Sequence, residues 1–205
     1  MTAPSSPAAT DAATATATGT APGVVVGILV GGASRRMGGA PKGLLDAGGG
    51  ESIVARSVRL VRALGLDVML VGGGAAYDAL GADRLPDAAV DAGPLAGLVA
   101  LLAHGGGADA ITLACDLPRW PSAVVARLAA LPAGSTCAPR VDGRWQPLAA
   151  RWSSTLRPEA ERRLREGPRA LHALLDAVHA EILALTPDEA AALADWDTPE
   201  DVRRR

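Results

Sequence analysis

Apolar and polar positions along this chain fall into two alternating patterns. Short apolar runs rich in β-branched residues are typical of buried strands. Three such runs occur, namely VVVGILV (24–30), DVMLVGGG (67–74) and AITLACD (110–116). The segments between them space their apolar residues as amphipathic helices do. Three helices are predicted there, in residues 51–65, 93–104 and 121–132. Strands that alternate with helices predict an α/β fold with a parallel or mostly parallel sheet and helices on both faces.

The pattern changes in the segment STCAPRVDGRWQPLAARW (135–152), where two extended runs surround Asp142-Gly143. This dipeptide is typical of hairpin turns, and we expect a β-hairpin insertion at the edge of the sheet or as a lid. The remainder predicts two helices, a strand and a last helix entered through DTPED. These elements fall in residues 157–166, 171–179, 181–185 and 197–201.

The chain contains no internal repeat and no interdomain linker, so we expect a single domain over residues 23–205. Residues 1–22 are rich in Ala, Thr, Ser and Pro and contain no Lys or Arg. They predict a disordered tail rather than a signal peptide. No apolar run approaches the roughly 18 residues of a membrane helix, so we expect a cytoplasmic protein without a membrane partner.

Composition narrows the class of ligand. Aromatic residues make up only 2% of the chain, and the formal net charge is -2 without a long basic run. These values argue against base-stacking platforms and a nucleic-acid partner. The two cysteines, Cys115 and Cys137, are too few and too far apart for a zinc site or a disulfide framework. A small acidic molecule bound at a local cationic site remains compatible with the sequence.

The first strand is followed by such a cationic site. GILVGGASRRMGGAPKGLL (27–45) contains six glycines and three cations in nineteen residues. It is neither a Walker loop nor a dinucleotide fingerprint, because both spacings fail. Glycines let backbone N–H groups approach phosphate oxygens, while Arg35, Arg36 and Lys42 supply positive charge. The segment therefore suits a triphosphate, whereas any one of these residues alone would indicate only a surface loop.

Carboxylates follow the strand ends, where open α/β sheets bind their ligands. Asp116 comes directly after the third strand and is either a ligand of Mg2+ or a cap of the next turn. Asp195 and Asp197 precede a Thr-Pro helix start. Either is a candidate cap, and either could supply a second carboxylate to the metal.

Five motifs in this order, LVGGASRRMGGAPKGLL, GPLAGL, CDLP, QPLAARW and DTPED, resemble the molybdenum cofactor guanylyltransferase family. The resemblance extends from about residue 24 to the C-terminus. It implies a Rossmann-like nucleotidyltransferase fold and a Mg2+-dependent enzyme. The implied reaction joins GMP from GTP to molybdenum-molybdopterin and releases pyrophosphate. It also leaves room for transient contact with proteins that deliver molybdopterin or receive the product.

Site residues follow from the same resemblance. It implies nucleotide contacts by Leu29, Val30, Gly31, Lys42, Asp87 and Asp116. Asp87 would accept hydrogen bonds from guanine, and Asp116 would hold Mg2+ with Asp197 as the second carboxylate. Arg36, Lys42 and Asp116 are the expected catalytic residues.

The chain differs from the family pattern at several positions. VGGG (71–74) stands where a relative can carry a polar contact such as Asn, and Asp197 stands where Asn is common. A CTP-dependent or sugar-phosphate nucleotidyltransferase is therefore the nearer alternative, and a non-catalytic nucleotide-binding protein the more distant one. Trp145 is either a packed edge-strand residue or a ring that stacks on the pterin. The three histidines are expected to be solvated side chains.

Overall fold

The computed structural model describes residues 23–31 and 41–193. The predictions for the tail 1–22, for Arg36, for Asp195 and Asp197, and for the helix entered through DTPED lie outside these ranges.

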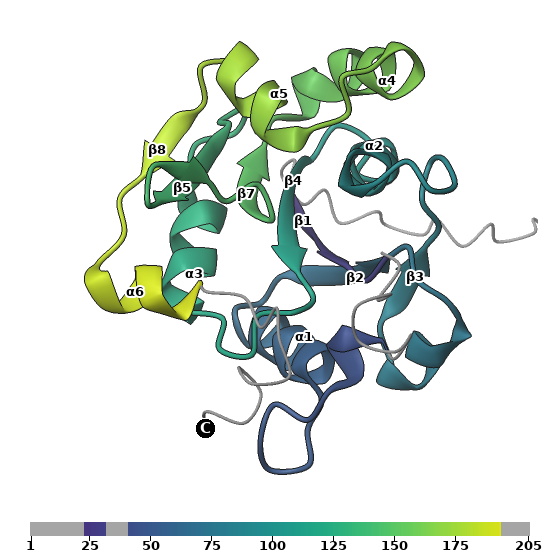
Figure 1. The fold of residues 1–205 in the computed structure, drawn as a ribbon, viewed down its shortest axis with the longest axis vertical. Helices are drawn as coiled ribbons and strands as arrows, with labels where there is room; N and C mark the ends of the chain where they lie inside the picture. Colours follow the sequence, from purple (N-terminus) through teal and green to yellow (C-terminus); the bar gives the residue numbers. More distant parts are fainter. Residues whose placement is uncertain (1–22, 32–40, 194–205) are drawn as a thin grey trace, which may run out of the picture.

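The described chain forms a sheet of eight strands in the order β3-β2-β1-β4-β7-β5-β6, with β8 paired to β5 (Figure 1). The strands β3, β2, β1 and β4 run parallel, and β7 is antiparallel to both β4 and β5. The strands are β1 (Val24–Leu29), β2 (Asp67–Val71), β3 (Asp83–Leu85), β4 (Asp109–Ala114), β5 (Cys137–Val141), β6 (Arg144–Trp145), β7 (Ala149–Trp152) and β8 (Glu181–Leu183). The predicted mostly parallel α/β sheet is confirmed.

Helices cover both faces of this sheet, as predicted. Figure 1 shows α1 and α3 on one face and α2, α4 and α5 on the other. The helices are α1 (Ile53–Ala63), α2 (Pro94–His104), α3 (Ser122–Ala130), α4 (Arg157–Glu166), α5 (Leu171–Ala177) and α6 (Pro187–Ala192), with short 3-10 turns η2 (Lys42–Leu44), η3 (Ala75–Leu80) and η4 (Ser154–Leu156). Within the described ranges, no helix is both long and apolar enough to cross a bilayer.

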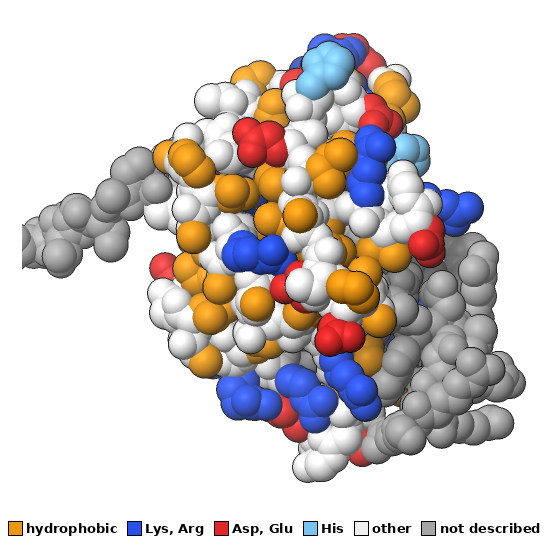
Figure 2. All heavy atoms as spheres, turned by 90° about the vertical axis from the view of Figure 1, so that its left-hand side faces the viewer, with side chains coloured by type: hydrophobic (Ala, Val, Ile, Leu, Met, Phe, Trp, Pro, Cys, Tyr) orange, Lys and Arg blue, Asp and Glu red, His pale blue; other side chains and the backbone are white. Residues whose placement is uncertain are grey.

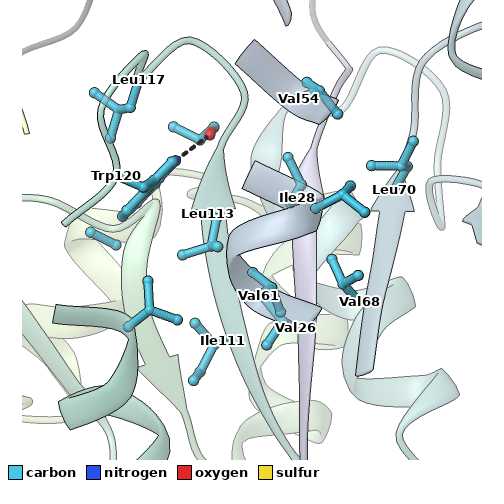
Figure 3. Close-up of a cluster of buried hydrophobic side chains, with 14 of the residues drawn as sticks. Val26, Ile28, Val54, Val61, Val68, Leu70, Ile111, Leu113, Leu117 and Trp120 are labelled. Carbon is cyan, nitrogen blue, oxygen red and sulfur yellow. Dashed lines mark hydrogen bonds between the residues drawn. The ribbon is translucent and has the colours of Figure 1, made fainter. Parts of the chain in front are cut away.

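Side chains of β1 point alternately to the two faces of the sheet and contribute to the hydrophobic core on each face. Val26 and Ile28 pack with α1, as Figure 3 shows, whereas Val25 and Leu29 pack with α2 on the opposite face. Gly27 lies under α2, and a Cβ there would come within 2.6 Å of the Leu101 side chain. The glycine therefore permits the close approach of α2 to the centre of the sheet.

The predicted hairpin turn is confirmed, but the prediction that both extended runs lie at the sheet edge or in a lid is wrong for the second run. Asp142 and Gly143 have φ values of 50° and 73° between β5 and β6. The second run is interrupted after Trp145 and continues as β7, which lies inside the sheet between β4 and β5. All four residues of β7 are buried. A turn motif in the sequence predicts which two strands pair across the hairpin. It does not predict which further strands of the sheet lie next to them.

Two short elements were missed from the pattern. The helix α6 begins with a capping box, in which the Thr186 hydroxyl accepts from the Glu189 N–H and the Glu189 carboxylate accepts from the Thr186 N–H. The spacing of this box was available in the sequence. By contrast, β3 has three residues with mixed polarity, and its pairing with β2 gives it strand conformation.

Candidate functional site

A cavity of about 580 Å3 opens at the carboxyl ends of the parallel strands and the N-terminus of α2. Its volume falls in the usual range for small-ligand sites. The residues that matter most for its chemistry are Leu29, Gly31, Asp87, Pro94, Asp116 and Leu148. Because α2 begins at Pro94, the positive end of its dipole faces this space and favours an anionic ligand.

The Lys42–Asp116 pair is the charged centre at one end of the site. Lys42 Nζ lies 3.7 Å from Asp116 Oδ2, and the two side chains are 20% and 26% exposed. Lys42 opens η2, where the buried Gly43 follows it. A Cβ at Gly43 would overlap Val54 and would lie 3.3 Å from the Cys115 carbonyl. The glycine therefore lets η2 pack against the end of β4, which brings the ammonium group to the carboxylate.

The end of β4 is held by two further hydrogen bonds. The indole N–H of Trp120 donates to the Ala114 carbonyl at 3.1 Å, as drawn in Figure 3. The Ala114 N–H donates to the Leu148 carbonyl at 2.9 Å. Asp116 comes two residues after Ala114, so these hydrogen bonds restrict the position of the backbone that carries Asp116. The sequence prediction that Asp116 follows the buried strand at the ligand edge is consistent with this geometry.

Asp87 lies at the other side of the cavity among glycines. A Cβ at Gly72 would lie 2.6 Å from Asp87 Oδ2, and one at Gly31 would lie 3.2 Å away. A Cβ at Gly97 would lie 3.3 Å from Asp87 Oδ1. Desolvation raises the pKa of the Asp87 carboxyl. The three glycines thus make room for a carboxylate that can accept two N–H groups of a ligand.

Arg84, which the sequence analysis missed, fixes the glycine turn beside Asp87. Its Nη2 donates to the carbonyls of Gly72 and Gly73 at 3.2 and 2.7 Å, and its Nη1 donates to Asp78 at 2.6 Å. The two glycines have φ values of 75° and 69°, a region in which other residues are strained. Arg84 is recognisable only once β3 is known to pair with β2.

Tyr77, which lies beside Gly43 and Gly73, and Cys115, which lines the cavity, were also not predicted to have a role there. Burial raises the pKa of Tyr77 to about 12. Burial, together with the charge of Asp116, raises the pKa of the Cys115 thiol to about 12. Both groups therefore remain protonated near neutral pH, and neither has the properties of an activated nucleophile.

The cavity gathers most of the described residues that were predicted from the sequence. Leu29, Gly31, Asp87 and Asp116 line it, and Lys42 reaches it through Asp116. Val30 is different, because its side chain is 5% exposed and packs in the core on the α1 face. A contact of Val30 with a ligand would therefore involve its backbone.

The histidines lie outside this cavity, and several lining residues, among them Asp91, were not predicted. All three histidines are exposed, as expected of solvated side chains. Asp91 lines the cavity with a positive φ of 52°. Its only sequence signal was its position just before the GPLAG motif. Among the described residues, no group of three or more His, Cys, Asp or Glu side chains is placed to hold a metal.

Comparison with known proteins identifies the family. The model of the MobA-like NTP transferase domain matches residues 26–193. A molybdenum cofactor guanylyltransferase from Pseudomonas putida GB-1 is 33% identical over 175 residues, which cover 83% of this chain and 91% of the relative. Another, from Pseudomonas putida KT2440, is 38% identical over 151 residues, covering 71% of this chain and 78% of the relative.

Solved structures agree on the fold. Molybdopterin-guanine dinucleotide biosynthesis protein A from Archaeoglobus fulgidus aligns with a TM-score of 0.67 at 21% identity, covering 88% of this chain and 95% of that one. A 2-C-methyl-D-erythritol 4-phosphate cytidylyltransferase from Thermus thermophilus aligns with a TM-score of 0.61 at 18% identity, again covering 88% and 95%. These likenesses support the Rossmann-like nucleotidyltransferase fold. Its curated relatives are molybdenum cofactor guanylyltransferases. The chain therefore belongs to the MobA-like NTP transferase family and is a nucleotidyltransferase.

Proposed function

We propose that this protein transfers GMP from GTP to molybdenum-molybdopterin, forming the molybdopterin guanine dinucleotide cofactor and pyrophosphate. The observation that carries the proposal is the arrangement of one cavity, with the Asp87 carboxylate among glycines on one side and the Lys42–Asp116 pair on the other. The names of the relatives supply the substrates. Because the product is a cofactor for another enzyme, the proposal includes transient contact with proteins that supply molybdopterin or receive the product.

The base would lie beside Asp87. Guanine offers two neighbouring N–H donors on one edge, and a carboxylate can accept both. Adenine and cytosine do not present this pair. The glycines at positions 31, 72 and 97 leave the space that the carboxylate occupies. Leu29 and Gly31, at the end of β1, would contact the nucleotide next to this carboxylate.

The triphosphate would lie over the Lys42–Asp116 pair. Lys42 matches a phosphate as a point charge, and the N-terminus of α2 adds favourable potential. Arg36, in the loop before Lys42, would supply a planar fork to the same phosphates. The proposal assigns a catalytic role to Lys42 and to Arg36.

The chemistry of the site also fits Mg2+. Asp116 offers a hard oxygen ligand at the cavity, and Mg2+ is usually held by one or two carboxylates together with substrate phosphates and water. A cage of three protein ligands is therefore not required. Asp116 would hold the ion with Asp197, which is the expected second carboxylate. The bound ion would neutralise charge on the phosphates and orient them.

The reaction needs no covalent protein intermediate. The terminal phosphate of molybdopterin attacks the α-phosphorus of GTP, a new P–O bond forms, and the bond to the leaving pyrophosphate breaks. The attacking group is already anionic, so no general base is required. Lys42 would stabilise the developing charge, and Asp87 would hold the base in place. Positioning and charge neutralisation thus account for the catalysis.

The test is pyrophosphate release from each of the four NTPs, with and without molybdenum-loaded molybdopterin. We expect release with GTP only when the acceptor is present. Release with CTP in its place would assign the protein to cytidylyl transfer. GTP binding without release under any condition would leave a nucleotide-binding protein rather than this enzyme.

A further inference from the structure

A second cavity, of about 560 Å3, lies between the β5–β6 hairpin and α5. We call it the hairpin pocket, and its lining residues are Arg140, Gly143, Arg144, Trp145, Pro147, His172 and Asp176. Figure 2 shows basic, acidic and His side chains together on the upper part of the molecule, the end at which α4 and α5 lie in Figure 1. None of these residues belongs to the nucleotide site described above.

The indole of Trp145 is held in one orientation within this pocket. Its N–H donates to Asp176 Oδ1 at 2.7 Å, and the guanidinium carbon of Arg140 lies 4.0 Å from the ring centroid. Arg140 also donates to the same carboxylate oxygen at 3.4 Å. Strand β6 and helix α5 are thereby joined around an aromatic ring that is only partly buried.

The charges around the ring favour an anionic ligand. Two arginines line the pocket against a single carboxylate, and Arg140 is already paired with that carboxylate. Arg144 is exposed and has no ion-pair partner among the described residues. A flat heteroaromatic ring that carries a negative group matches the combination of indole, guanidinium and carboxylate.

The hairpin pocket adjoins the nucleotide cavity. Pro147 lines the pocket and its neighbour Leu148 lines the cavity. The Leu148 carbonyl is bonded to the Ala114 N–H, two residues before Asp116. Trp145 precedes Leu148 by three residues, so at most about 11 Å of extended chain separates them. The two spaces therefore share the chain segment 145–148, and one molecule that carries both a flat ring and a phosphate would reach both of them.

We propose that the hairpin pocket binds the flat ring of the acceptor substrate, a phosphorylated pterin. This inference rests on the proposed function for the identity of the acceptor. The pocket would hold the ring while the phosphate of the same molecule reaches the nucleotide cavity. Asp176 would accept N–H groups of the pterin, and the positive charge of Arg144 would favour the approach of the phosphorylated molecule as a whole. Trp145 thereby becomes a specificity-determining residue for the acceptor and not for the nucleotide.

The experiment measures binding of a pterin 6-methyl phosphate ester, which joins a pterin ring to a phosphate without the metal-binding part. Its fluorescence anisotropy is followed in the full chain, wild type and variants. Trp145→Leu should raise its Kd by about tenfold to hundredfold, the scale of a lost aromatic stack. Trp145→Phe should retain most of the affinity, since it keeps a ring. The Kd of GTP, measured by calorimetry, should not change.

Arg144→Ala provides a second variant that cannot disturb the core, because the side chain is exposed. It should raise the Kd of the ester about threefold or more at low salt and less at high salt, because exposed charges are screened. Arg165→Ala, an equally exposed change on α4, is the matched control and should leave the Kd unchanged.

Failure of this inference is distinguishable from failure of the proposed function. No binding of the ester to the wild type, or equal binding to Trp145→Leu and Arg165→Ala, would overturn the hairpin pocket while leaving GTP turnover untouched. A parallel loss of GTP binding in Trp145→Leu would also overturn it. Use of CTP instead of GTP would change the proposed function but leave the pterin subsite standing.

Discussion

The two ends of β4 each lead to an acidic residue paired with a cation, and the two pairs differ in their N–O distance and in their exposure. At the amino end, Asp109 pairs with Arg151 at 2.8 Å, and the side chains are 4% and 3% exposed. At the carboxyl end, Asp116 pairs with Lys42 at 3.7 Å beside an open cavity. The first pair is enclosed by the fold, whereas a ligand can reach the second.

The buried pair is fully hydrogen-bonded. Asp109 accepts from Arg151 and from the N–H groups of Gly134 and Ser154. Arg151 also donates to three carbonyls at the end of α3, those of Leu128, Ala129 and Leu131. Burial alone raises the pKa of Asp109, but the bonds from Ser154, Arg151 and Gly134 outweigh it and hold the pKa below its usual value. Such a saturated pair supports the fold, whereas the pair at the other end borders the cavity and is the one for which we propose a catalytic role.

The largest effect is expected from the exposed end. Asp116→Asn keeps the size of the side chain but removes the charge that would hold Mg2+. Pyrophosphate release should fall by about 10³-fold or more, beyond the loss caused by removing one electrostatic partner. The melting temperature should change little, since the side chain lies at the cavity. A variant that keeps ordinary turnover at ordinary Mg2+ would return Asp116 to the role of a turn cap.

The next largest effect is expected at the buried end. Asp109→Asn leaves Arg151 as an uncompensated buried charge, which costs about 3–5 kcal/mol of the free energy of unfolding. Urea denaturation measures this loss. Turnover of the protein that remains folded should equal that of the wild type. An unchanged urea midpoint in Asp109→Asn would show that the Asp109–Arg151 pair does not stabilise the fold.

The same pair predicts a pH dependence. Because the pKa of Asp109 is lowered in the folded state, its stabilising contribution is present above the unfolded value of about 3.9. It is lost as the pH falls through the lower folded-state pKa. The free energy of unfolding, measured as a function of pH below about 4, should therefore fall less steeply with acidification in Asp109→Asn than in the wild type. Parallel curves would contradict the assignment.

Lys42→Ala should reduce turnover by about 10²-fold, the scale of one removed electrostatic partner. The side chain is 20% exposed and paired with Asp116. A small change in melting temperature is expected, because ion pairs that are partly exposed contribute little. Arg127→Ala, which removes an ion pair to Glu189 on α6, is the control for loss of a cation. Wild-type turnover in Lys42→Ala would remove the loop from the mechanism.

Asp87→Ala should have the smallest effect, confined to base choice. The preference of the protein for GTP over ATP, measured by calorimetry with Mg2+, should narrow by about tenfold, the scale of hydrogen bonds to a charged group. The raised pKa of Asp87 means that this preference should weaken on acidification at a higher pH than for an ordinary Asp. A preference that survives in Asp87→Ala would place guanine recognition elsewhere.

The sequence predicted those features that depend on local pattern. The apolar period placed β1, β2, β4 and α1 to α3, and residues directly after strands pointed to Asp116 at the ligand edge. Arg84 and the Asp109–Arg151 pair were not predictable, because their partners come from other elements. Asp109 and Arg151 are 42 residues apart in the chain. The interior place of β7 was missed for the same reason, since strand order is fixed by packing and not by the turn.

Our central proposal is that the carboxyl end of β4 holds Mg2+ together with GTP. Its most direct test is calorimetry of GTP binding with and without Mg2+, for the wild type and for Asp116→Asn. In the wild type, Mg2+ should tighten GTP binding, and in Asp116→Asn this enhancement should be lost while the affinity without metal is kept. Equal enhancement in both proteins would contradict the claim.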